Sequence, residues 1–217
     1  MGKREAGPPI ARSVRRAGDE KYSKLLAEAL VMDGSVDRAT HRFHTYPARM
    51  HPDAAAMIID ACPGPVHDPF CGGGTVLVEA MLAGRESSGT DLSPIASLVS
   101  RARTADKSLA TPMRSAARKI TEKAQLRIDV EVNEELEKWY QPHVAQELGR
   151  IRDEIAVADE RIQHLLRAIF SSIIVKASFR KSDTQNRRET HHRAPGTTAI
   201  LFHKKTREFG RALETLP

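Results

Sequence analysis

Apolar residues in the second half of the chain recur at helical spacing. Val144, Leu148, Ile151 and Ile155 follow one another at intervals of four, three and four residues, as on one buried helix face. Asp159 is placed to cap a following helix. The apolar series of that helix is Ile162, Leu165, Leu166, Ile169 and Ile173. The two patterns predict a pair of amphipathic helices joined by a short turn.

Similar patterns predict helices elsewhere in the chain. Pro52 suits the first position of one helix, and Thr111 followed by Pro112 looks like an N-cap with Pro at the first helical position. Residues 182–198 lack apolar periodicity and carry many Arg, His, Asn and Thr side chains, which predicts an exposed loop. The expected helices span residues 19–32, 52–61, 111–125 and 199–213.

Strand and helix patterns alternate between these regions. Residues 65–68 and 86–91 are strand candidates, and residues 74–83 and 94–104 are helix candidates. Strand, helix, strand and helix in this order are typical of a βαβ unit with a parallel sheet. We therefore expect an α/β fold that contains the beginning of a doubly wound domain.

The composition divides the chain further. Residues 1–20 are rich in Arg, Gly and Pro and are expected to form a mobile basic arm. Residues 21–110 hold the α/β pattern, and residues 111–217 form a helical region with a basic loop. The chain has 34 Lys and Arg against 28 Asp and Glu, a net charge of +6. This surplus favours an anionic partner such as nucleic acid, although proteins without such a partner also carry it.

Cysteine content and hydropathy indicate a compartment. Cys62 and Cys71 are the only cysteines and form no CxxC pair, so a disulfide framework is not expected. The first residues include Lys3 and Arg4 but no apolar stretch follows them, and no apolar run approaches the roughly 18–20 residues that span a bilayer. We expect a cytoplasmic protein that does not enter a membrane.

Three consecutive glycines, Gly72 to Gly74, separate the first strand candidate from the following helix. Glycine permits a sharp turn and the close approach of a ligand to the backbone. The loop lacks the last glycine of GxGxxG and the Lys-Ser/Thr pair of a Walker loop. Asp68, just before the turn, would disfavour a phosphate and favour an ammonium or sulfonium group, which points to S-adenosylmethionine. Asp91 is placed to bind ribose hydroxyls; alternatively, the glycines form a structural turn and Asp91 caps a helix.

Three segments resemble the amino-group DNA methyltransferases, which methylate adenine N6 or cytosine N4 and have a related branch acting on RNA guanine. Motif I is matched by Asp68-Pro69-Phe70-Cys71-Gly72-Gly73-Gly74-Thr75, motif II by Asp91-Leu92-Ser93-Pro94, and motif X by residues 44–52. The resemblance implies a partial Rossmann-like class I methyltransferase domain that binds S-adenosylmethionine and acts on DNA. The cofactor residues that it implies are Tyr46, Pro47, Asp68, Pro69, Phe70, Cys71, Gly72, Gly74, Thr75, Asp91 and Leu92.

The sequence departs from this family in its catalytic motif. Family members carry a [Asp/Asn/Ser]-Pro-Pro-[Tyr/Phe/Trp] tetrapeptide after a later strand, where it holds the target amino group of a flipped base. The only Pro-Pro pair here, Pro8-Pro9, has other flanking residues and precedes the cofactor motifs. The catalytic residues are therefore unknown, and a second polypeptide could supply them. The alternatives are a catalytically silent cofactor- or nucleic-acid-binding module, or a fragment of an RNA methyltransferase.

Basic residues near the expected loop could follow a phosphate backbone, although an ordinary solvated loop would look the same. Other candidates are weaker. His41, His44 and His51 lack the spacing of a metal site, so no metal is expected. Cys71 at a helix start could have a lowered pKa but has no identifiable base. The candidate nucleic-acid-binding residues are Arg180, Lys181, Arg187, Arg188 and Arg193.

Overall fold

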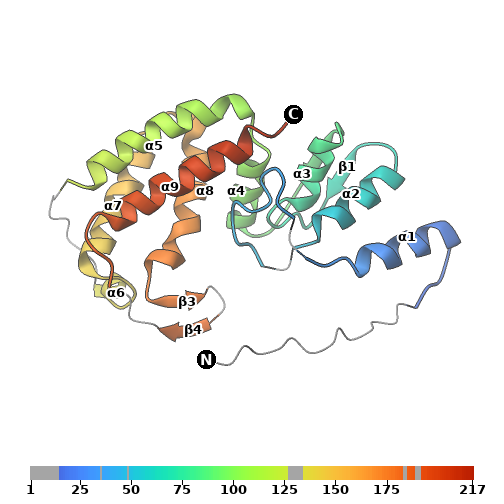
Figure 1. Cartoon of the computed structure of the whole chain (residues 1–217), viewed down its shortest axis with the longest axis horizontal. Coiled ribbons are helices and arrows are strands. Elements are labelled where there is room, and N and C mark those ends of the chain that lie inside the picture. Colours follow the sequence, from blue (N-terminus) through green and yellow to red (C-terminus); the bar gives the residue numbers. More distant parts are fainter. Residues whose placement is uncertain (1–14, 35, 48, 127–133, 183–184, 189–191) are drawn as a thin grey trace.

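The structure, a computed structural model, has a helical part and a smaller α/β part, with α4 (Pro94–Arg103) between them (Figure 1). It describes residues 15–34, 36–47, 49–126, 134–182, 185–188 and 192–217. The other helices are α1 (Glu20–Leu30), α2 (Pro52–Ala61), α3 (Thr75–Leu82), α5 (Ala110–Ala124), α6 (Glu134–Glu137), α7 (Pro142–Ala156), α8 (Glu160–Ala177) and α9 (Thr197–Leu213).

The α/β part is built on one βαβ unit. Strands β1 (Val66–Asp68) and β2 (Ser87–Gly89) pair in parallel with Val66 opposite Ser87, and α3 connects them. This order agrees with the expected strand, helix, strand and helix. Because parallel strands end at the same edge, the glycine loop after β1 and the residues after β2 lie side by side. All three residues of β2 are exposed, which is unusual for a parallel sheet.

The larger core lies among α5, α7, α8 and α9, with α4 packed against α8. Phe202 and Phe209 of α9 are buried there, at 0% and 1% exposure. Phe43, from the segment before α2, stacks on Phe209 with ring centroids 3.7 Å apart. The expected pairing of the two amphipathic helices is confirmed by the contact between α7 and α8. The α/β part is thereby joined to the helical core through the segment that precedes α2.

Helix caps confirm one expectation and correct another. Asp159 caps α8, accepting a hydrogen bond from the N–H of Arg161 at 3.0 Å. The expected N-cap at Thr111 is wrong, because α5 already begins at Ala110 after a 3₁₀ turn over Lys107–Leu109. Asp106 caps that turn instead, and Pro112 is tolerated in the first helical turn, where N–H groups have no partner in the helix.

The expected loop at residues 182–198 is also corrected. Strands β3 (Arg180–Ser182) and β4 (Gln185–Arg188) pair antiparallel, and α9 begins at Thr197. The strands of a hairpin this short are held together by backbone hydrogen bonds, so they need no alternation of apolar residues. No helix among the described residues has the length and apolar character to cross a membrane.

Candidate functional site

A cavity of about 1280 Å³ opens beside the glycine loop. Its walls come from the loop after β1, from the segment preceding α2 and from the end of α1, including Leu26 and Leu30. That α1 forms a wall of the cavity could not be predicted from its sequence, because its apolar face is equally suited to core packing. The sequence-predicted residues that line the cavity are Tyr46, Asp68, Phe70, Cys71, Gly72 and Thr75.

Backbone conformation and close packing explain why glycine is required at positions 72 and 74. Gly72 and Gly74 have φ angles of 48° and 80°, in the left-handed region where side chains are strained. A Cβ on Gly74 would lie 2.8 Å from the Cβ of Ser100 in α4, and one on Gly72 would lie 3.2 Å from the Tyr46 ring. The loop is therefore held between α4 and Tyr46, with its backbone open to the cavity on the side of Gly72.

Two carboxylates are fixed at the ends of the parallel strands. Asp91 accepts hydrogen bonds from the N–H groups of Gly72 and Ser93, both at 2.8 Å. Asp68 accepts one from the N–H of Phe70 at 3.0 Å. The N-cap of α4 is Ser93, so Asp91 does not cap that helix directly. Its carboxylate instead joins the end of β2 to the glycine loop.

A buried guanidinium holds this region together. Arg103 at the end of α4 is 0% exposed and donates to the carbonyl oxygens of Gly73, His41 and His44 at 2.7, 3.1 and 2.8 Å. Burial, with a smaller contribution from Arg49, lowers its pKa to about 10, so Arg103 stays protonated at neutral pH.

Sequence reasoning missed Arg103. The signal was its spacing, since Ala96, Val99 and Arg103 repeat at intervals of three and four on the buried face of α4. A charged residue on such a face must find buried partners.

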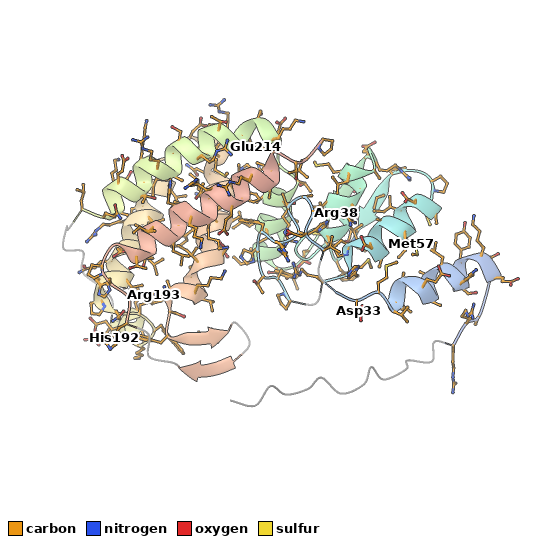
Figure 2. All side chains as sticks on the ribbon, viewed as in Figure 1. Asp33, Arg38, Met57, His192, Arg193 and Glu214 are labelled. Carbon is orange, nitrogen blue, oxygen red and sulfur yellow. The ribbon has the colours of Figure 1, made fainter. Side chains whose placement is uncertain are left out.

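Glu79 of α3 forms a second buried link to the segment before α2. It is 4% exposed and contacts His41 Nε2 at 2.5 Å and Arg38 Nη2 at 3.0 Å, while Arg38 also pairs with Asp53 of α2. Burial alone would raise the pKa of Glu79, but hydrogen bonds from His41 and Arg38 outweigh it and lower that pKa below its ordinary value. In Figure 2 Arg38 lies beside the helices of the α/β part, to which both of its partners belong.

Other sequence-predicted cofactor residues lie outside the cavity lining. Pro47 and Pro69 are exposed, Gly74 is buried against α4, and Leu92 is 101% exposed. Asp91 does not line the cavity either but touches it through Gly72. Leu92 follows β2 with its side chain directed to solvent.

The Cys71 thiol is buried at the glycine loop. Burial raises its pKa, in spite of a contact with the Ser100 hydroxyl that acts in the other direction. A raised pKa reduces the thiolate fraction, so the structure does not favour Cys71 as a nucleophile.

The next residues are the basic ones that the sequence suggested for binding nucleic acid. Of these, Arg193 lies with its neighbour His192 at the far end of the helical part (Figure 2). Arg180 stands over the Trp139 ring at 5.4 Å, and Arg193 donates to the carbonyl oxygen of Lys176. Both therefore make contacts within the protein. The side chains of Lys181, Arg187 and Arg188 lie outside the described residues.

The three histidines considered as a group have separate partners. His41 contacts Glu79, His44 lies 3.1 Å from the Ser171 hydroxyl of α8, and His51 accepts from the N–H of Asp53 at the start of α2. Each of them thus fixes the segment before α2 to a different helix. These contacts account for the burial of His41 and His44.

Comparison with known proteins gives one partial likeness. The chain is similar to the Type II methyltransferase M.MvaI of Kocuria varians, with 41% identity over 71 residues. The match covers 30% of this chain and 16% of that protein, so the chain spans a small fraction of its relative. No family model and no solved structure matches the chain. These findings indicate a partial relationship to a methyltransferase.

Replacing Arg103 tests the buried link. Arg103→Met keeps much of the side-chain volume but leaves three carbonyl oxygens without their donor. We expect a loss of about 2–4 kcal/mol in the free energy of unfolding, measured by urea titration followed by circular dichroism. The control Arg101→Met changes an exposed residue of the same helix and should cost less than about 0.5 kcal/mol. Equal losses in the two variants would contradict the assigned role.

Stability should also depend on the charge of Glu79. Because its pKa is lowered in the folded protein, ionised Glu79 stabilises the fold above the ordinary glutamate value of 4.5, and this contribution disappears as the pH falls through the folded-state pKa. Urea titrations at pH 6 and at about pH 3.5 should show a smaller acid-induced loss for Glu79→Gln than for the unchanged chain. Glu86→Gln, at an exposed position, should keep the full loss.

Proposed function

We propose that this chain is the S-adenosylmethionine-binding portion of a DNA methyltransferase that acts on an exocyclic amino group, adenine N6 or cytosine N4. Its α/β part would be an incomplete Rossmann-like class I methyltransferase domain. The observation that carries the proposal is the hydrogen bond from Gly72 to Asp91, which joins an open glycine loop to a carboxylate beside the cavity. The partial likeness to a type II methyltransferase supports the same reading.

In this proposal Asp91 would bind the ribose. It follows the second parallel strand, and each of its carboxylate oxygens accepts one backbone hydrogen bond. A carboxylate oxygen has two lone pairs, so each oxygen can still accept from a hydroxyl. The two backbone donors hold the side chain in place, so binding a ribose would cost little conformational entropy.

The charge of Asp68 favours a cationic cofactor over a phosphate. Asp68 lines the cavity at the carboxyl end of β1, beside the amino terminus of α3. A helix amino terminus alone would attract an anion. With a carboxylate at the same place, the site is better suited to a ligand that carries an ammonium or a sulfonium and no phosphate. Aromatic Tyr46 also lines the cavity and packs directly against Gly72.

The size of the cavity agrees with a site that holds more than its cofactor. Small-molecule pockets usually measure about 300–1,000 Å³, and this one is about 1280 Å³. A flipped base would need part of that space. DNA is the partner that the proposal implies, with the Phe70 side chain, 86% exposed, at the rim of the cavity.

In the proposed mechanism this chain binds and orients the cofactor. When bound, S-adenosylmethionine supplies an electrophilic methyl group on its sulfonium. Asp91 would hold the ribose, Asp68 would lie near the positive end, and the glycine loop would allow close approach of the cofactor. Positioning of the target amine falls to a Pro-Pro-Tyr-type tetrapeptide, which the printed sequence does not contain after the cofactor motifs.

Calorimetric titration with S-adenosylmethionine tests the cofactor site. We expect binding by the unchanged chain and a loss of about tenfold in affinity for Asp68→Asn, which removes a charge worth roughly 1.4 kcal/mol at this position. Asp60→Asn, at an exposed position of α2, should bind as the unchanged chain does. A folded chain that does not bind the cofactor would refute the proposal.

Methyl transfer tests the division between binding and catalysis. With radiolabelled S-adenosylmethionine and DNA, this chain alone should transfer no methyl group above the background of a no-enzyme control, because the tetrapeptide that holds the amine is missing. DNA methylation by the chain alone would show that its own residues complete the active site. Methylation of RNA but not DNA would favour the RNA alternative.

A further inference from the structure

Helix α9 carries a large share of the positive charge of the chain. It contains four Lys and Arg residues and one Glu, a surplus of three, where the whole chain has a net charge of +6. Three of the four, Lys204, Arg207 and Arg211, recur at intervals of three and four residues, so they share one face of the helix. All three are exposed. We call these three residues the α9 stripe.

The stripe is not neutralised within the protein. In the part of the chain that the structure describes, its three side chains form no ion pair and no hydrogen bond. The carboxylates in and just after α9 have other partners, since Glu208 pairs with Lys205 and Glu214 pairs with Arg114. Arg114 is the main cause that lowers the pKa of Glu214, and Arg211 makes the smallest contribution.

Exposed arginines on other helices are placed differently. In α5, α7 and α8 they have carboxylate partners 2.6 to 2.9 Å away: Arg118 with Glu122, Arg152 with Asp153 and Arg161 with Asp159. The helix dipole favours Arg211, which lies in the last turn of α9. It gives no reason for Lys204 and Arg207, which precede that turn. The stripe therefore offers its charge to a partner.

A lysine of the adjacent helix adds to this positive field. Lys176 lies in the last turn of α8, which packs against α9. Burial lowers the pKa of Lys176, and the charges of Lys205 and Lys204 lower it further, while Glu208 acts in the opposite direction without outweighing them. The ammonium groups thus lie close enough to repel one another. A bound anion would reduce this repulsion.

We propose that the α9 stripe, with Lys176 beside it, binds the phosphate backbone of double-stranded DNA. The choice of DNA rests on the proposed function. The stripe extends over about 10.5 Å of helix, at 1.5 Å per residue. A DNA duplex carries one negative charge per about 1.7 Å of its axis, so a segment of this length holds roughly six phosphates. Each stripe cation would thus have a phosphate within its reach.

The segment before α2 connects the stripe to the cavity. Its Phe43 stacks on Phe209 of α9, and the neighbouring Arg42 lines the cavity. In Figure 1 α9 ends on the side of the helical part that faces the α/β part. Contacts to phosphates fix the position of a duplex without reading its sequence. The stripe would therefore hold the DNA on the helical part, outside the proposed cofactor site.

A lipid surface fits α9 less well than DNA does. A helix that lies in a membrane interface inserts its apolar face among the headgroups. The apolar face of α9 includes Phe202, Phe209 and Leu213, which are at most 1% exposed in the helical core. Those side chains would have to leave the core to reach a membrane. The stripe can act without such a change only on a partner that it binds by charge.

The salt dependence of DNA binding tests the stripe. Fluorescence anisotropy with a labelled duplex of about 20 base pairs is followed from about 50 to 200 mM salt. We expect the combined variant Lys204→Gln, Arg207→Gln, Arg211→Gln to reduce the slope of log K against log salt by about 2.7, at 0.9 per lost contact. The reduction should be the same for two duplexes of unrelated sequence, because phosphates carry no base information.

A matched control removes the same charge from positions that already have partners. Lys138→Gln, Arg152→Gln, Arg161→Gln combines three exposed residues whose carboxylate partners are Glu135, Asp153 and Asp159. It should change the slope by less than about one. Equal reductions in the two combined variants, or no binding of DNA by the unchanged chain at the lowest salt, would overturn the inference.

Footprinting of the unchanged chain maps the contact without any variant. Acetic anhydride modifies exposed lysines, and mass spectrometry locates the products. We expect saturating DNA to slow the modification of Lys204 and Lys176 and to leave that of Lys138 unchanged. Protection of Lys138 with continued reaction of Lys204 would place the DNA elsewhere and contradict the assigned surface.

Calorimetry with S-adenosylmethionine separates this inference from the proposed function. The stripe variant should bind the cofactor as the unchanged chain does. Cofactor binding together with a salt slope that the stripe variant does not alter would refute the stripe and leave the proposed function standing. An altered slope in a chain that binds no cofactor would support the stripe and refute the proposed function. Binding to phosphatidylserine vesicles in preference to DNA, lost in the stripe variant, would assign the surface to lipid and overturn the inference.

Discussion

The buried guanidinium of Arg103 is the constraint on which the site depends. Removing a charge from water is costly, and the cost is offset only where the charge finds several well-placed partners. Arg103 finds three carbonyl oxygens, two from the segment before α2 and one from the glycine loop. Because one side chain donates hydrogen bonds to both segments, it holds Tyr46 and the backbone of the glycine loop in place relative to each other.

The helical part and the α/β part contribute differently to this arrangement. The helical part has a continuous core, and Phe43 extends that core to the segment before α2 by stacking on Phe209. In the described residues the α/β part has two short strands, and all residues of one of them are exposed. This part is held in place by α4 and by the hydrogen bonds around Glu79. A stable helical body thus supports a small α/β unit whose sheet has open edges.

The sequence predicted what depends on local pattern. The glycine loop between β1 and α3 and the cap at Asp159 could be predicted because short motifs and turn chemistry determine them. The ribose-binding role of Asp91 stays a prediction. The hairpin of β3 and β4 was not, since backbone pairing left no apolar alternation. The start of α5 was misplaced because Asp106 supplies a cap before Thr111. The role of Arg103 could not be predicted, because two of its acceptors lie about 60 residues earlier in the chain. The cavity wall formed by α1 could not be predicted either, because it depends on how that helix packs against α2.

The way Arg103 is bound has a consequence for sequence variation. All three of its acceptors are main-chain carbonyl oxygens, so the hydrogen bonds of Arg103 do not depend directly on the side chains at positions 41 and 44. Position 73 is different, because a Cβ there would lie 3.1 Å from Arg103 Nη1. Substitutions at the first two positions that keep the path of the backbone would leave these bonds intact. The contact itself would therefore leave no pairwise signal between Arg103 and positions 41 and 44, and a statistical search for co-varying positions would pass over it.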